Sequence, residues 1–205
     1  MPLYLHQKTA QFELAVWHIT EQLEDFEQLG IEADADIVNT NKKLQWCASR
    51  YLTRLIAGSE VELTHDEFGR PHFSHNRVNI SISHSNEFAA IIISNTTPVG
   101  IDIEPIHPKV ERVAHKFMHE EELARLEPET RIVQLITYWS AKEALYKLYG
   151  KKQLSFKTQL RIAPFNLSER GTLNGAVYAD DWQQEGLEIP YSVFENHVLV
   201  YVLGR

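Results

Sequence analysis

The segment that most constrains the fold of this chain is Tyr138–Gly150, which has the pattern of the end of an amphipathic helix. Its large apolar side chains recur at helical spacing, so they would line one face of the helix and cover a core. These residues are Trp139, Leu145, Leu148 and Tyr149. Gly150 is a typical helix stop, because glycine adopts the left-handed conformation of a C-terminal cap without strain. The rest of the chain must supply the layer that this helix covers.

Three charged residues of the same segment fall outside the apolar stripe: Lys142, Glu143 and Lys147. Glu143 and Lys147 are four positions apart, which makes them neighbours on the surface of a helix. The simplest interpretation is a solvated ion pair that contributes little to stability. The alternative is that these charges belong to a site completed by residues elsewhere in the chain.

Two carboxylates upstream are candidates for such a site. The run Val99–Ile103 is rich in β-branched residues and predicts a strand. Because alternate residues of a strand point to the same side, Asp102 and Glu104 would project together. Ile101 and Ile103 would then face the opposite way, into the core.

Carboxylates placed side by side repel each other unless a cation lies between them. A third carboxylate, Glu143, would complete an oxygen-rich set of the kind that Mg²⁺ prefers. The competing interpretation is that Asp102 and Glu104 lie on a strand that runs out into solvent before Pro105. Both interpretations remain open on these residues alone.

A second helix is predicted from about residue 41 to residue 57, again from apolar periodicity. Its start carries Lys42 and Lys43, although cations at a helix N-terminus oppose the helix dipole. Either these lysines bind a phosphate group or they only increase solubility. Arg50 and Arg54 lie four positions apart further along the same helix.

Composition excludes several classes of protein. The chain has 205 residues and a formal net charge of −8, which argues against a general nucleic-acid binder. No apolar run has the length of a membrane span, and the first residues lack the pattern of a secretory signal. The single cysteine, Cys47, cannot form an internal disulfide or a thiolate metal cluster. We therefore expect a cytoplasmic protein.

Two motifs, taken together, resemble the signature of the 4′-phosphopantetheinyl transferases. Gly-Ile-Asp-Ile-Glu at 100–104 is followed by Trp-Ser-x-Lys-Glu-Ala-x-x-Lys at 139–147. The chain length and both halves are similar to the surfactin-synthetase (Sfp) type of this superfamily, and not to the short trimeric holo-acyl-carrier-protein synthases. The resemblance covers roughly residues 40 to 160 and is weaker in both flanks.

The resemblance implies roles for individual residues. Asp102, Glu104 and Glu143 would hold Mg²⁺. Either Glu143 or a metal-bound water would take the proton of the attacking serine, and Lys147 would neutralise or protonate the leaving phosphate. Gly-Arg-Pro at 69–71 and the segment that ends in Ser83 and His84 are similar to the family's coenzyme A loops. The candidate contacts to coenzyme A are Lys42, Lys43, Arg50, Arg70, Pro71, Ser83, His84 and Lys142.

The activity implied by the resemblance is transfer of 4′-phosphopantetheine from coenzyme A to a serine of an apo acyl or peptidyl carrier protein, with release of 3′,5′-ADP. Such carriers serve fatty acid, polyketide or non-ribosomal peptide biosynthesis, and a monomeric enzyme is expected. Because carriers are typically acidic, the basic run from Lys147 to Lys157 is a candidate docking surface; a solvated basic face is the alternative.

Two other functions are alternatives to the transferase. A metal-dependent phosphohydrolase would use the same three carboxylates, and a non-enzymatic α+β binding module is the other possibility.

The expected fold is α+β, a pseudo-dimer of two similar halves, each a small, mostly antiparallel sheet packed on a long helix. Trp46-x-Ala48 and Trp139-x-Ala141 lie 93 positions apart (139 − 46), each within the main helix of its half. The resemblance implies the same architecture, with the active site between the halves. We expect residues 1–97 to contact the coenzyme A phosphates and residues 98–205 to carry the metal and catalytic residues.

Overall fold

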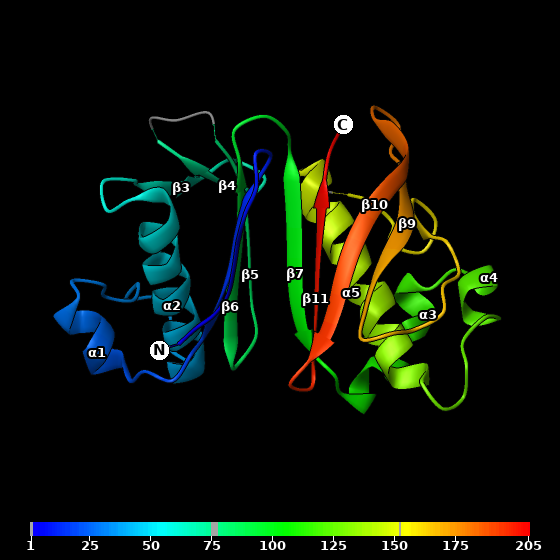
Figure 1. Ribbon diagram of the computed structural model, residues 1–205, viewed down its shortest axis with the longest axis horizontal. Helices are drawn as coiled ribbons and strands as arrows, with labels where there is room; N and C mark the ends of the chain where they lie inside the picture. Colours follow the sequence, from blue (N-terminus) through cyan, green and yellow to red (C-terminus); the bar gives the residue numbers. More distant parts are fainter. Residues whose placement is uncertain (1, 75–77, 152) are drawn as a thin grey trace. The chain divides into compact units, whose positions relative to one another are not determined.

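The protein is described by a computed structural model that covers residues 2–74, 78–151 and 153–205 (Figure 1). The chain forms two compact units, Met1–Thr97 and Pro98–Arg205, here called the N-terminal and C-terminal units. Each unit is described by itself.

The N-terminal unit contains an antiparallel sheet and one long helix. Its four-stranded sheet has the order β1-β2-β6-β5, and a separate two-stranded sheet pairs β3 with β4. The elements are β1 (Leu3–Lys8), β2 (Glu13–His18), α1 (Leu23–Gln28), α2 (Thr40–Ala57), β3 (Leu63–His65), β4 (Pro71–Phe73), β5 (Asn79–His84) and β6 (Phe88–Ser94).

Helix α2 begins and ends as its sequence requires. The side chain of Asn39 accepts a hydrogen bond from the backbone N–H of Lys42 at 3.1 Å, which satisfies one of the free amides of the first turn. Gly58 follows the helix with φ of +102°, a conformation that favours glycine. The helix buries Cys47, Ala48 and Leu52 in the core of the unit.

The C-terminal unit has a five-stranded antiparallel sheet with the order β7-β11-β10-β9-β8. Its long helix, α5, packs along this sheet (Figure 1). The elements are β7 (Val99–Pro105), the 3₁₀ helix η1 (Pro108–Arg112), α3 (Ala114–Phe117), α4 (Glu120–Leu123), α5 (Arg131–Tyr149), β8 (Leu160–Ile162), β9 (Arg170–Tyr178), β10 (Gln183–Phe194) and β11 (His197–Leu203).

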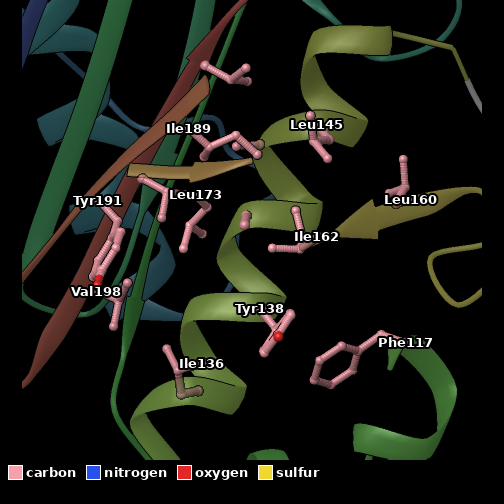
Figure 2. Packing of buried hydrophobic residues seen from close by; sticks show 14 of the residues in the cluster. Phe117, Ile136, Tyr138, Leu145, Leu160, Ile162, Leu173, Ile189, Tyr191 and Val198 are labelled. Carbon is pink, nitrogen blue, oxygen red and sulfur yellow. The ribbon is translucent and has the colours of Figure 1, made fainter. Parts of the chain in front are cut away.

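Side chains from α5 and the sheet strands form the core of the C-terminal unit. Figure 2 shows Leu145 of α5 near Ile162 of β8, with Leu173 and Ile189 on the neighbouring strands; all four are at most 2% exposed. The helix ends at Gly150, which has φ of +72°, in the left-handed region. The predicted glycine stop is therefore confirmed; of the predicted core residues, Leu145 and Leu148 are buried, and Trp139 and Tyr149 are half-buried against the same core.

The α+β fold is confirmed. The helix predicted from about residue 41 to residue 57 is α2, and the strand predicted at Val99–Ile103 is β7, which extends to Pro105. The similarity of the two halves by internal duplication stays a prediction.

None of the helices in the described ranges is both long enough and apolar enough to span a lipid bilayer.

Candidate active site

Strand β7 brings the two predicted carboxylates onto the face that packs against α5. Gly100, Asp102 and Glu104 alternate with Ile101 and Ile103, which are fully buried on the opposite face. The strand is held in place by pairing with β11 along its whole length.

The close approach of α5 to β7 depends on Gly100. A Cβ atom at this position would lie 2.0 Å from the carbonyl oxygen of Ala144 and 3.1 Å from the backbone nitrogen of Leu148. Only a residue without a side chain allows the helix backbone to rest on the strand here. The glycine of the Gly-Ile-Asp-Ile-Glu motif therefore sets the distance between the two elements that carry the carboxylates.

Helix α5 places Trp139, Glu143 and Lys147 on one side, because they are spaced by four residues. Lys147 Nζ donates hydrogen bonds to Asp102 Oδ1 at 2.8 Å and to the carbonyl oxygen of Ile101 at 2.9 Å. Trp139 Nε1 donates to Glu104 Oε1 at 3.2 Å. The helix and the strand thus share one polar cluster.

The ion pair expected between Glu143 and Lys147 does not form. Lys147 is paired with Asp102 instead, and within the described residues Glu143 makes neither a hydrogen bond nor an ion pair. Glu143 is nevertheless half-buried. A half-buried carboxylate without a donor is costly, and such a cost is common at functional sites.

The electrostatics of the cluster favour its neutral form. Burial raises the pKa of Glu143 to about 7, with a further contribution from the negative charge of Asp102. Burial also raises the pKa of Glu104 to about 7, and Asp102 again adds to the shift. The ammonium of Lys147 opposes both shifts. Fully ionised, the three carboxylates repel one another strongly enough that an additional cation would stabilise them.

The donor set has the chemistry of a hard-cation site, since it offers carboxylate oxygens and no sulfur or imidazole. Its present arrangement is not a closed site: in the part of the chain that the structure describes, no three His, Cys, Asp or Glu side chains are grouped as ready metal ligands. The ammonium of Lys147 holds Asp102 Oδ1. Asp102, Glu104 and Glu143 thus fit a magnesium ion by chemistry and charge, and side-chain rotation would have to gather them around it.

Lys142 is buried inside the C-terminal unit and paired with Glu122. Its side chain is 0% exposed and its ammonium donates to Glu122 Oε2 at 2.7 Å and to the carbonyl oxygens of Phe117 at 2.7 Å and Phe156 at 3.0 Å. An ammonium has three N–H donors, and all are used. Burial lowers the pKa of Lys142, although the negative charge of Glu122 opposes this. In this arrangement Lys142 joins elements inside the C-terminal unit, and its predicted contact with coenzyme A stays a prediction.

Glu122 completes this buried polar cluster. It is 2% exposed, and its carboxylate also accepts hydrogen bonds from the backbone N–H groups of His119 at 2.7 Å and Ile162 at 3.0 Å. The cluster connects α4, α5 and β8. Its function is structural, because every contact that fixes it lies within the C-terminal unit.

Several of the predicted phosphate contacts lie at loop and helix ends of the N-terminal unit. Lys42 is exposed in the first turn of α2. Arg70 follows the turn at Gly69, where its backbone N–H donates to Asp66 Oδ1 at 2.8 Å, and Pro71 opens β4. Ser83 and His84 end β5.

Two further candidates on α2 line separate cavities. Lys43 borders a cavity of about 360 Å³ together with Cys47 and Glu27. Arg50 borders another, of about 430 Å³, and its guanidinium carbon lies 4.7 Å from the centre of the Trp46 ring. None of Lys42, Arg70, Ser83 or His84 lines the Arg50 cavity.

Two lysines of the predicted basic run are paired with acidic side chains. Lys147 is paired with Asp102, and Lys151 with Asp181. The nearby Arg161 pairs with Glu121 at 2.7 Å. Lys152, which was part of the predicted surface, lies outside the described residues.

The helical pattern predicts Trp139 only as a core residue, and its contact with Glu104 was not predicted. The available signal was its position four residues before Glu143, which places it on the same side of the helix. Its ring packs against Phe117 and Phe156, with centroids 5.1 and 5.5 Å away. The indole is therefore fixed in place while its N–H reaches the site.

Comparison with known proteins supports the predicted relationship. Residues 98–202 match the model of the 4′-phosphopantetheinyl transferase superfamily. The chain is 34% identical over 107 residues to the 4′-phosphopantetheinyl transferase gsp of Aneurinibacillus migulanus. The aligned segment covers 50% of this chain and 44% of that protein. It is 27% identical over 115 residues to the 4′-phosphopantetheinyl transferase AcpT of Salmonella typhi, covering 53% of this chain and 60% of AcpT.

The chain thus spans about half the length of the curated relatives that it matches. The family match includes β7, α5 and all three carboxylates of the cluster. It extends over 105 of the 205 residues (202 − 98 + 1), which is more than half. This chain belongs to the 4′-phosphopantetheinyl transferase superfamily.

Proposed function

We propose that this protein transfers the 4′-phosphopantetheine group of coenzyme A to a serine hydroxyl of an apo carrier protein and releases 3′,5′-ADP. The observation that best supports this is the cluster of Asp102, Glu104 and Glu143 beside Lys147, within the segment that matches the family. Attack of a hydroxyl on a pyrophosphate requires neutralisation of charge, alignment and removal of a proton, and no covalent intermediate with the protein.

Asp102, Glu104 and Glu143 would hold Mg²⁺, as the chemistry of the donor set allows. When bound, the ion would neutralise negative charge on the pyrophosphate. Side chains of the protein would carry out the proton transfer and the positioning. Glu143, whose pKa of about 7 lies near neutral pH, would accept the serine proton. Lys147 would move from Asp102 to the leaving phosphate and donate its N–H groups there, while Trp139 would hold Glu104 in position.

The phosphates of coenzyme A would bind to cationic and polar groups of the N-terminal unit. The residues we propose for this are Lys42, Lys43, Arg70, Pro71, Ser83 and His84. Local positive charge is needed because the chain as a whole has a net charge of −8. Arg70 is suited to this role, since a planar guanidinium matches the geometry of a phosphate.

The partner would be an acyl or peptidyl carrier protein, of fatty acid, polyketide or non-ribosomal peptide biosynthesis. Because Lys147 and Lys151 are already paired with acidic residues, docking by charge alone is not favoured at these two positions of the predicted basic run. We also propose a cytoplasmic location, in which an unpaired thiol such as Cys47 stays reduced.

The test is an intact-mass measurement on an apo acyl carrier protein incubated with the purified protein, coenzyme A and Mg²⁺. The expected result is a gain of one phosphopantetheine that disappears in EDTA. In the Glu143→Gln variant the rate should fall by at least about 100-fold, as for loss of a general base. Release of phosphate or 3′,5′-ADP without carrier modification, on several unrelated carriers, would instead indicate a phosphohydrolase. If neither the carrier nor coenzyme A changes, the result would favour a non-enzymatic binding module.

A further inference from the structure

Among the residues that the structure describes, no acidic side chain forms an ion pair with the guanidinium of Arg50. Within the described residues its recorded contact is the stacking on Trp46, at 4.7 Å, and it makes neither an ion pair nor a hydrogen bond. Arg50 is half-buried, and burial lowers its pKa. A partly desolvated cation is costly unless something satisfies it, and stacking on one ring recovers only about 0.5–1 kcal/mol at an exposed site.

Arg50 lines a cavity of about 430 Å³ in the N-terminal unit. One side of α2, the Gly30–Glu32 loop and the segment that leads into β3 form its walls, and the cavity is partly open to solvent. Its buried and half-buried lining residues also include Ile31, Trp46 and Leu63. The lining therefore offers one planar cation beside apolar and aromatic side chains. Small-molecule sites use apolar side chains together with a few polar or charged groups.

The exposed residues that line the same cavity carry a net negative charge, because three glutamates outnumber one arginine. Glu32, Glu60 and Glu62 line it and are exposed, as is Arg54, whose Nη1 donates to the carbonyl oxygen of Gly30 at 3.3 Å. Glu60 and Glu62 accept hydrogen bonds from Ser59 and Ser74, which leaves their negative charge in place. A simple anion would be repelled by these glutamates, and a simple cation by Arg50.

We propose that this cavity binds a small zwitterionic molecule of the amino acid class, at a site separate from that for coenzyme A. Its carboxylate would pair with the guanidinium of Arg50, its aliphatic part would lie against Trp46, Ile31 and Leu63, and its ammonium would face the exposed glutamates. The planar fork of Arg50 suits a bidentate contact with a carboxylate. The cavity lies within the size range of small-ligand sites.

The experiment uses three probes of similar shape that differ in charge: L-leucine, which carries both charges, 4-methylpentanoate, which lacks the ammonium, and 3-methylbutylamine, which lacks the carboxylate. Each is titrated into the ¹⁵N-labelled protein, and the indole N–H signal of Trp46 is followed by NMR. Because the chain has four tryptophans, the signal is assigned from its disappearance in Trp46→Phe. We expect a saturable shift with L-leucine, at an affinity about tenfold or more above that of either single-charge probe.

Two variants test the assigned contact. Arg50→Gln should weaken L-leucine binding by about tenfold or more, and Arg50→Lys should retain part of it, because the charge remains without the planar fork. Arg112→Gln, which changes an exposed arginine of the C-terminal unit, is the matched control and should bind as the parent does. Thermal unfolding of each variant verifies that it is folded.

Coenzyme A serves as the competing ligand, since the sequence predicts Arg50 as one of its phosphate contacts. If Arg50→Gln weakens coenzyme A binding and leaves the response to L-leucine unchanged, Arg50 belongs to the coenzyme A site and the proposal is overturned. It is equally overturned if none of the three probes gives a saturable shift of Trp46. Transferase activity is measured separately on the parent protein, so its absence would count against the proposed function and not against this site.

Discussion

At the residue scale, Lys142 has the contacts of a structural residue. Replacing it with methionine would leave the carboxylate of Glu122 buried without its cation, so we expect Lys142→Met to lower the free energy of unfolding by about 3–5 kcal/mol. Urea unfolding measures this change. Lys151→Met, which removes one partner of an exposed ion pair, is the control and should have little effect. Unchanged stability with weaker coenzyme A binding in Lys142→Met would support the predicted phosphate role.

Trp139 offers a second prediction at this scale. In Trp139→Phe the ring still packs against Phe117 and Phe156, but the hydrogen bond to Glu104 is lost. We expect the affinity for Mn²⁺, measured by electron paramagnetic resonance, to fall by about tenfold, because partners that orient a metal ligand typically have effects of this size. Trp182→Phe is the matched control. Equal affinity in Trp139→Phe and the parent would show that Trp139 does not position Glu104.

These residues also show what the sequence can predict. Asp102 and Glu104 project to one side because of strand alternation, which is a local property, and the sequence is sufficient for it. The burial of Lys142 depends on acceptors at Phe117, Glu122 and Phe156. These lie outside α5, so the periodicity of α5 cannot predict them. Lys147 was placed beside Glu143 by helix spacing, yet the residue that it pairs with lies on β7.

At the scale of elements, the packing of α5 on β7 depends on Gly100. Gly100→Ala would bring a methyl group against the backbone of Ala144, which cannot move aside as a flexible side chain would. We expect a loss of stability of about 3 kcal/mol, the upper end of the range for overpacking, and a loss of activity because the carboxylates separate from the helix. Thermal unfolding and the carrier mass assay measure the two effects.

Gly204→Ala is the matched control for this change, since a Cβ there would meet its nearest atoms at 3.4 Å, close to ordinary contact. It should affect stability far less than Gly100→Ala. Similar stability in the two variants would mean that α5 shifts freely on the sheet.

The long helices were predictable and the short elements were not. Helices α2 and α5 carry strong periodicity and cap residues such as Asn39 and Gly150, which specify them locally. In contrast, residues 108–123 form three short elements, η1, α3 and α4, each of at most 5 residues. Helices of that length are stabilised by tertiary contacts, such as those of Glu122, and not by their own sequence.

At the scale of the whole molecule, the carboxylate cluster should make stability depend on pH. Glu104 and Glu143 have pKa values of about 7 in the folded protein against 4.5 as the ordinary value. Between these values the folded state binds more protons than the unfolded state, so stability falls as pH rises through this window and the loss is complete above about pH 7. Thermal unfolding in EDTA, at several pH values, measures the slope.

Adding Mg²⁺ should remove much of this loss at the upper end of the window, because a ligand that binds the folded state stabilises it. The double variant Glu104→Gln/Glu143→Gln should show a flatter slope in EDTA and no stabilisation by Mg²⁺. If the variant and the parent have the same slope, other groups are responsible for the pH dependence.

The position of the Lys147 ammonium on Asp102 has a consequence for the order of binding. A metal ion that entered the cluster would displace this ammonium, so its entry would be an exchange of one cation for another. If coenzyme A binds as proposed, its phosphates would offer the displaced ammonium a new anionic partner. Each ligand would then favour the other, and thermodynamic linkage requires the enhancement to be equal in both directions. Calorimetric titration of Mg²⁺ with and without 3′,5′-ADP would measure this cooperativity, and Lys147→Met should abolish it.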